Sequence, residues 1–150
     1  MSEIQPDELL SSETVFHGHL IDLRKDTVRL PNGKGAEREV VVHPEVVAML
    51  PVLDDGRLVL VRQYREAVGE ILLEVPAGGI DGGETPEEAA RREMKEETGY
   101  AVGSMDLLST FYSSPGFCTE KMYLYLLHGL TPGERLHGAS RRVRDIRPHP

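Results

Sequence analysis

Three glutamates near the middle of the chain have the type and spacing of metal ligands. Glu93, Glu96 and Glu97 stand at positions i, i+3 and i+4 of the segment EMKEE. On an α-helix they would share one face, within an arc of roughly 100°. Like charges on adjacent turns repel one another and destabilise a helix. A hard cation such as Mg²⁺ or Mn²⁺ would remove that repulsion by binding the carboxylate oxygens. On spacing alone, a solvated acidic helix face is the alternative.

A helix that carries these glutamates is predicted from Thr85 to Thr98. Thr85 is a candidate N-cap, with a proline at the first helical position and Glu88 completing a capping box. Gly99 stands where a left-handed residue usually ends a helix. The preceding loop, residues 76–84, is rich in glycine, and glycine allows a backbone carbonyl to approach a metal. A flexible connection is the ordinary interpretation of such a loop taken by itself.

The segment GGIDGGETPEEAARREMKEETGY resembles the Nudix box. That motif has a glycine, five residues, a glutamate, seven residues, Arg-Glu, a bulky apolar residue, one residue, Glu-Glu, one residue, a glycine and a bulky apolar residue. Every spacing matches, although the family usually has an aliphatic residue where Tyr100 stands. The resemblance implies an α+β Nudix fold: a mixed β-sheet sandwiched between helices (α/β/α), with an N-terminal antiparallel strand region. The matching positions are Gly78, Glu84, Arg92, Glu93, Met94, Glu96, Glu97, Gly99 and Tyr100.

The resemblance also implies a role for each position in or beside the box. The cofactor would be Mg²⁺ or Mn²⁺, and the three glutamates would be both its ligands and the catalytic residues. The proton of the attacking water would go to a glutamate of the C-terminal part or to a box glutamate, for which we favour Glu93 or Glu97. The implied metal ligands are the Ala77 carbonyl, Glu93, Glu96 and Glu97, and the implied supports of the box are Gly78, Glu84, Arg92 and Gly99.

Residues outside the box resemble the ADP-ribose diphosphatases of this superfamily. Pro115 follows Tyr100 by fifteen residues, and a proline there accompanies ADP-ribose activity. The implied reaction converts ADP-ribose and water to AMP and ribose 5-phosphate. Arg65 would contact the diphosphate or terminal ribose, while Glu39 would hold the adenine side. The whole implied substrate set is Glu39, Arg65, Pro115, Gly116 and Glu120, for which surface or turn positions are the plain alternatives.

Three other functions stay open at this point. A Nudix hydrolase of other nucleoside diphosphate derivatives would act on sugar nucleotides, dinucleoside polyphosphates or oxidised nucleotides. A non-catalytic ADP-ribose-binding module would not need the whole series of carboxylates. A purely structural domain is the remaining possibility.

Short apolar segments around the box predict a mixed α+β sandwich. Apolar runs on both sides of Asp54-Asp55-Gly56 predict a hairpin. The resembling family commonly dimerises through its N-terminal strands, so a homodimer is expected. Strands are predicted within residues 15–30, 37–42, 46–53, 58–61, 71–75, 107–112 and 121–127.

The predicted organisation is a flexible N-terminus over residues 1–14, a Nudix domain over 15–130 with its box at 78–100, and an atypical Arg-rich tail over 131–150. The resemblance leads us to expect an acid-rich loop, a strand and a terminal helix after about residue 130. The sequence there is TPGERLHGASRRVRDIRPHP, in which only Glu134 and Asp145 are acidic. The tail has few apolar residues that could attach it to the core, so its position in the fold is not predicted.

The composition narrows the expected partners and location. Acidic residues outnumber basic ones by 25 to 17, for a net charge of −8. Because sequence-independent nucleic-acid binding depends on Lys and Arg, we expect a small-molecule nucleotide substrate and no nucleic acid. No apolar run approaches the roughly 18 residues of a membrane span, and the first residues do not resemble a signal peptide. The single cysteine, Cys118, cannot form an internal disulfide, which fits a cytoplasmic location.

Overall fold

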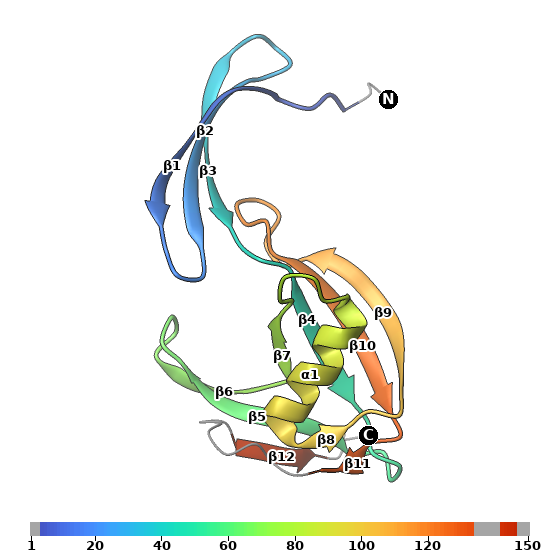
Figure 1. The fold of residues 1–150 in the computed structure, drawn as a ribbon. Coiled ribbons are helices and arrows are strands. Elements are labelled where there is room, and N and C mark those ends of the chain that lie inside the picture. The colour runs from blue at the N-terminus through green and yellow to red at the C-terminus, as the bar shows by residue number, and fades with distance from the viewer. Residues whose placement is uncertain (1–3, 134–141, 147–150) are drawn as a thin grey trace. The chain divides into compact units, whose positions relative to one another are not determined.

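The computed structural model describes residues 4–133 and 142–146 (Figure 1). The chain divides into two compact units, which are described separately. The N-terminal unit comprises Met1–Pro44 and Tyr112–Lys121, and the box unit comprises Glu45–Phe111 and Met122–Pro150.

The N-terminal unit contains an antiparallel sheet of three strands in the order β1-β2-β3. A turn joins the last two strands, and Gly33 adopts a φ of 82° there while its N–H donates to the Leu30 carbonyl at 2.8 Å. Asp26 is buried in the sheet, where the Ser12 hydroxyl donates to it at 2.6 Å. That hydrogen bond lowers the pKa of the Asp26 carboxyl. The strands are β1 (Glu8–His17), β2 (Asp22–Arg29) and β3 (Gly35–Val42).

The prediction of a flexible segment over residues 1–14 is wrong for residues 8–14, which form the larger part of β1. Glu8 lies opposite Arg29 at one end of the β1–β2 ladder, and His17 lies opposite Asp22 at the other. An ion pair of 2.8 Å joins Glu8 to Arg29. The polar composition was misleading because β1 is exposed along its length, so the backbone ladder holds the strand without burying its side chains.

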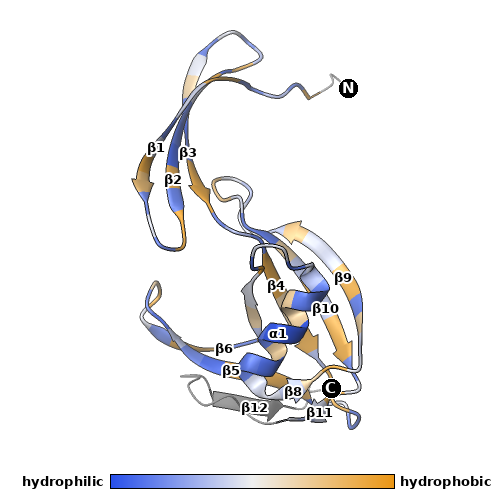
Figure 2. Cartoon of the chain, viewed as in Figure 1, coloured by the Kyte–Doolittle hydropathy of each residue, from blue (hydrophilic) through white to orange (hydrophobic). Residues whose placement is uncertain are grey.

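The largest sheet of the box unit has four strands in the order β7-β4-β10-β9. β4 runs parallel to β10 and antiparallel to β7, so the sheet is mixed, as predicted. All but one of the β4 residues are buried, and Figure 2 shows this strand as hydrophobic. Its strands are β4 (Val46–Pro51), β7 (Ala77–Gly79), β9 (Ser104–Tyr112) and β10 (Lys121–His128).

A second sheet has three strands, β12-β5-β6, and a short ladder joins β11 to β8. The predicted hairpin around Asp54-Asp55-Gly56 is wrong beyond its tip, because β4 and β5 share one bridge, Val52–Leu58, and then enter different sheets. β4 already uses both of its edges for β7 and β10, which leaves none for β5. The strands are β5 (Leu58–Arg65), β6 (Glu70–Glu74), β8 (Tyr100–Ala101), β11 (Thr131–Pro132) and β12 (Arg142–Ile146).

The described part of residues 131–150 is attached to the box unit through backbone pairing. β11 lies antiparallel to β8, and β12 lies antiparallel to β5 with Arg142 opposite Arg62. Backbone pairing needs no apolar pattern, which is why the arginine-rich sequence gave no sign of it. Glu134 lies outside the described residues.

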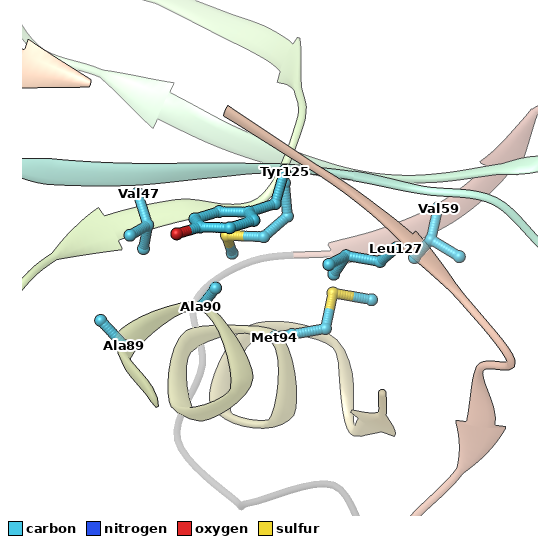
Figure 3. Close-up of a cluster of buried hydrophobic side chains, with 8 residues drawn as sticks. Val47, Val59, Ala89, Ala90, Met94, Tyr125 and Leu127 are labelled. Carbon is cyan, nitrogen blue, oxygen red and sulfur yellow. The ribbon is translucent and has the colours of Figure 1, made fainter. Parts of the chain in front are cut away.

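One helix, α1 (Pro86–Thr98), is present in the described ranges, and it packs against β4 and β7. Figure 3 shows its apolar side chains facing those of the strands across a shared core. The expected mixed sheet is present and one helix packs on it, while the described ranges contain no second helical layer for the expected α/β/α sandwich. No described helix is long and apolar enough to cross a membrane. The core cluster is Val47, Met49, Val59, Ala89, Ala90, Met94, Tyr125 and Leu127.

Candidate active site

Local chemistry sets both ends of the helix that carries the box glutamates. Thr85 has extended backbone angles (φ −76°, ψ 157°), and its side-chain oxygen accepts from the Glu88 N–H at 3.3 Å. The Glu88 carboxylate in turn accepts from the Thr85 N–H at 2.8 Å, which completes the predicted capping box. Gly99 ends the helix with a φ of 79°. These caps fix the register of α1 and therefore the face on which its glutamates lie.

The first half of the glycine-rich loop, residues 76–80, is held against β4 and the residue before it. The Pro76 carbonyl accepts from the Met49 N–H at 2.9 Å, and the Ile80 N–H donates to the Glu45 carbonyl at 3.1 Å. Between these two bonds, Ala77 lies opposite Ala48 in the β4–β7 ladder. Ala77 is thus part of a sheet, and its carbonyl has a fixed direction before any ligand arrives.

Gly78 is the point where the helix and the loop meet. A Cβ atom added to Gly78 would lie 2.0 Å from the Glu93 Cδ and 2.2 Å from its Oε1. The Glu93 carboxylate therefore occupies the space that any larger residue would need. Because Gly78 follows Ala77 directly, the structure brings two of the predicted metal ligands to the same stretch of backbone.

Arg92 is at the centre of the hydrogen bonds around the box. Its Nε and Nη2 donate to the two oxygens of Glu84, each at 2.8 Å, and its Nη1 donates to the Glu93 Oε1 at 2.7 Å. Nη2 also reaches the Gly79 carbonyl at 2.9 Å. The planar fork of arginine suits such a two-oxygen contact, which lysine would not reproduce. The same bonds raise the pKa of Arg92, through Glu84 first, and lower the pKa of Glu84.

Glu96 and Glu97 differ in exposure although they are neighbours. Glu97 is buried at 4% exposure, whereas the Glu96 side chain is 47% exposed and lies 3.5 Å from Arg92. Within residues 4–133 and 142–146, no three acidic, histidine or cysteine side chains converge closely enough to hold a metal. The donors nevertheless fit Mg²⁺ or Mn²⁺, because they are carboxylate and carbonyl oxygens. The glycine cradle also leaves one carboxylate on the backbone beside Ala77.

Arg65, predicted to contact the substrate, lies in the box unit at the end of β5. Its guanidinium donates to both oxygens of Glu74, at 2.9 and 2.6 Å, and this bond raises the pKa of Arg65. Gln63 donates to the same carboxylate at 2.8 Å. Sequence reasoning missed Glu74 and Gln63, which no motif marks. A substrate phosphate at Arg65 would have to share the guanidinium with Glu74.

The other predicted substrate residues belong to the N-terminal unit. Glu39 is exposed on β3, and Pro115 and Gly116 are exposed in the loop after β9. Glu120 Oε1 lies 3.8 Å from the Nδ1 of His43, a neighbour that the sequence did not suggest.

Backbone hydrogen bonds order the loop over residues 113–120 against the end of β3. The Val41 N–H donates to the Phe117 carbonyl at 2.7 Å, and the Thr119 N–H donates back to the Val41 carbonyl at 2.9 Å. Thr119 also accepts from the His43 N–H at 2.9 Å through its side chain. Pro115 and Gly116 therefore belong to an anchored loop.

Comparisons with known proteins agree with this geometry. The NUDIX domain family matches residues 42–150, and the nucleoside diphosphate sugar hydrolase N-terminal domain family matches residues 8–41. An ADP-ribose pyrophosphatase of Bacillus subtilis (strain 168) is 41% identical over 125 residues, which span 83% of this chain and 68% of that protein. A methanol dehydrogenase activator of Bacillus methanolicus is 38% identical over 138 residues, spanning 92% and 75% of the two chains.

A solved structure is also similar. The crystal structure of an ADP compounds hydrolase superposes with a TM-score of 0.85 at 28% identity, covering 97% of this chain and 80% of that one. The likeness therefore includes the sheets as well as the box helix. The family match, the superposition and the contact between Glu93 and Gly78 agree. The chain therefore belongs to the Nudix hydrolase family.

Proposed function

We propose that this Nudix enzyme hydrolyses the diphosphate bond of ADP-ribose to AMP and ribose 5-phosphate. The observation that carries the proposal is the packing of the Glu93 carboxylate against Gly78, next to Ala77. This contact brings carboxylate and carbonyl oxygens together, as a divalent cation requires. The choice of ADP-ribose is supported by the relative named as an ADP-ribose pyrophosphatase, at 41% identity.

The cation would be Mg²⁺ or Mn²⁺, held by the Ala77 carbonyl and by Glu93, Glu96 and Glu97. Such a cation, when bound, neutralises diphosphate charge and makes water a better nucleophile near neutral pH. Arg92 holds Glu93 and Glu84 in place with bonds of 2.7 and 2.8 Å, so it is a positioning residue. Positioning lowers the barrier because the ligands need no rearrangement when the substrate arrives.

For the general base we favour Glu97 over Glu93. Oε1 of Glu93 already accepts a charge-assisted hydrogen bond from Arg92 at 2.7 Å, which makes that carboxylate a weaker base. Glu97 is buried on the same helix face, where the surrounding protein limits its movement. Replacing Glu97 by glutamine removes the base and a metal ligand, whereas glutamine at Glu93 removes a ligand only.

Substrate contacts and assembly complete the proposal. Arg65 would bind a phosphate or the terminal ribose, and Glu39, Pro115, Gly116 and Glu120 would contact the nucleotide. We also propose a homodimer formed through the N-terminal strands. β1 is exposed throughout and carries Leu9 and Phe16 at 59% and 55% exposure, and apolar side chains gathered on one strand favour burial against a partner. The lone Cys118 fits action in the cytoplasm.

A second candidate substrate class is supported by a separate observation. Residues 8–41 match the N-terminal domain of nucleoside diphosphate sugar hydrolases. Other nucleoside diphosphate sugars therefore belong in the first substrate panel beside ADP-ribose, together with dinucleoside polyphosphates and oxidised nucleotides.

The test is incubation of the whole chain with ADP-ribose and Mg²⁺, with and without EDTA, followed by chromatography for AMP. AMP that disappears with EDTA and in Glu97→Gln supports the proposal. Binding of ADP-ribose without AMP would show a binding module instead. Cleavage confined to another member of the panel would move the chain to that substrate.

A further inference from the structure

Two tyrosines on β10 face the helix side of the sheet and take no part in the site described above. Tyr123 and Tyr125 lie two residues apart, opposite Val47 and Met49 of the parallel strand β4. Tyr125 is buried at 2% exposure inside the core (Figure 3), and Tyr123 packs at the edge of the same cluster. Alternate residues of a strand point to one face, so their two hydroxyls lie on the same side of the sheet.

The hydroxyl of Tyr123 reaches the beginning of the box loop through Glu45. It donates to Glu45 Oε2 at 3.0 Å. The carbonyl of Glu45 accepts from the Ile80 N–H at 3.1 Å, two residues before Gly82. A single residue thus receives a side-chain bond from β10 and a backbone bond from the loop.

The hydroxyl of Tyr125 reaches the other end of the same loop. It is hydrogen-bonded to Glu87, which lies in the first turn of α1. Residues 80–87 are therefore attached to β10 at both ends. Between the ends stand Gly82 and Gly83, the latter with a φ of 93°, and such residues give a loop much conformational freedom when nothing holds it.

We propose that Tyr123 is a positioning residue that acts through Glu45 to hold the loop after Ile80, so that Glu93 stays in register with the sheet-held Ala77 carbonyl before the cation binds. Tyr125 and Glu87 form the second anchor of the same device. The proposal rests on the proposed metal site. Its Ala77 carbonyl lies three residues before the first anchor, and its glutamates lie on the helix that the second anchor holds. Without the anchors, cation binding has to order the loop, and the affinity falls by that ordering free energy.

The decisive measurement is Mn²⁺ binding by the substrate-free whole chain, with free Mn²⁺ followed by electron paramagnetic resonance. Loss of one hydrogen bond changes an equilibrium by about three- to tenfold, so Tyr123→Phe and Glu45→Ala should each raise the Kd for Mn²⁺ by that factor. Glu45→Gln keeps an oxygen that accepts from Tyr123, so its Kd should stay within about twofold of the unchanged chain. The double variant Tyr123→Phe/Glu45→Ala should be no weaker than either single one, because both remove the same bond.

Tyr64→Phe is the matched control, since Tyr64 is an exposed tyrosine on β5 in the same unit. The Mg²⁺ concentration for half-maximal AMP release should rise in parallel with the Kd for Mn²⁺, while kcat at saturating Mg²⁺ changes less. An unchanged Kd in Tyr123→Phe would overturn the proposal, and an unchanged Kd in Tyr125→Phe would overturn the second anchor. Equal weakening in Glu45→Gln and Glu45→Ala would also overturn it, because the charge of Glu45 and not its hydrogen bond would then matter. If the chain releases no AMP but the Mn²⁺ affinities follow the pattern, the substrate assignment fails and the positioning role stands.

Discussion

Gly78→Ala is the substitution whose consequence follows most directly from the packing around the box. Its Cβ would lie 2.0 Å from the Glu93 Cδ, whereas ordinary contacts begin at 3.4 Å, so the carboxylate must withdraw by about 1.4 Å. A displacement of about 1 Å in a catalytic arrangement costs about 100-fold in rate, or roughly 2.7 kcal/mol of transition-state stabilisation. We expect kcat for ADP-ribose to fall by at least that factor at saturating Mg²⁺. The fold should survive, because the Glu93 side chain can rotate outward.

The assay is the initial rate of AMP release, with thermal unfolding measured on the same samples. Gly82→Ala is the matched control in the same loop, since a Cβ at Gly82 has no atom within 4 Å, and its kcat should stay within about twofold. Glu93→Gln should be as slow as Gly78→Ala, and the double variant should be no slower than either, because both changes remove the same ligand.

The reasoning would be refuted if Gly78→Ala kept the kcat of the unchanged chain with an intact melting transition. It would also be refuted if Gly82→Ala lost as much activity as Gly78→Ala. In the first case the seat of Glu93 on the loop would have no part in catalysis. In the second, the loop would require flexibility and not a specific cradle.

Arg92→Lys should lower kcat by about 10- to 100-fold through loss of the two-oxygen bond to Glu84, as seen in initial rates, with no effect expected on ADP-ribose binding. Thr85→Ala should lower the free energy of unfolding by about 1 kcal/mol because the cap of α1 is lost, and urea unfolding measures it. Arg92 lowers the pKa of Glu84 below its ordinary value of 4.5. The stabilisation from Glu84 is therefore full above pH 4.5 and is lost as the pH falls through the lowered pKa, so Glu84→Gln should flatten the acid side of the stability profile. Leu9→Lys with Phe16→Lys should halve the mass seen by light scattering, and a mass unchanged by the substitutions would contradict dimerisation through β1.

The sequence predicts the helix and its caps well because their chemistry is local. Thr85, Glu88 and Gly99 act on backbone groups within one turn, and the observed N-cap, capping box and left-handed end match the expectation. The spacing of the box glutamates follows from the same helix. Strand pairing depends on distant partners instead. β4 takes its parallel neighbour from residues 122–127 and not from the adjacent β5, and no pattern near Asp54-Asp55-Gly56 carries that information.

The contacts that shape the site were hidden from the sequence for a related reason. The sequence identifies Gly78 as a position of the box. It does not show that the Glu93 carboxylate fills the space where a Cβ of residue 78 would lie, because that depends on packing. The bond between Tyr123 and Glu45 joins residues 78 positions apart. A signal was present in the alternation of Tyr123 and Tyr125, which places two hydroxyls on one face of a strand. That pattern identifies the face but not the partners.

The two ends of the box helix differ in how well their charges suit the helix dipole. Its N-terminus follows every preference, with a capping box, a proline and two acidic residues in the first turn. Its last turn has a favourable Lys95 and a left-handed Gly99. Glu96 and Glu97, however, place negative charge near the negative end of the helix dipole, which costs roughly 0.3–1 kcal/mol for each exposed charge. Glu97 is buried as well, which adds desolvation. These two charges therefore do not stabilise the helix by themselves, whereas a divalent cation against that face would neutralise their repulsion and offset the cost of burying Glu97.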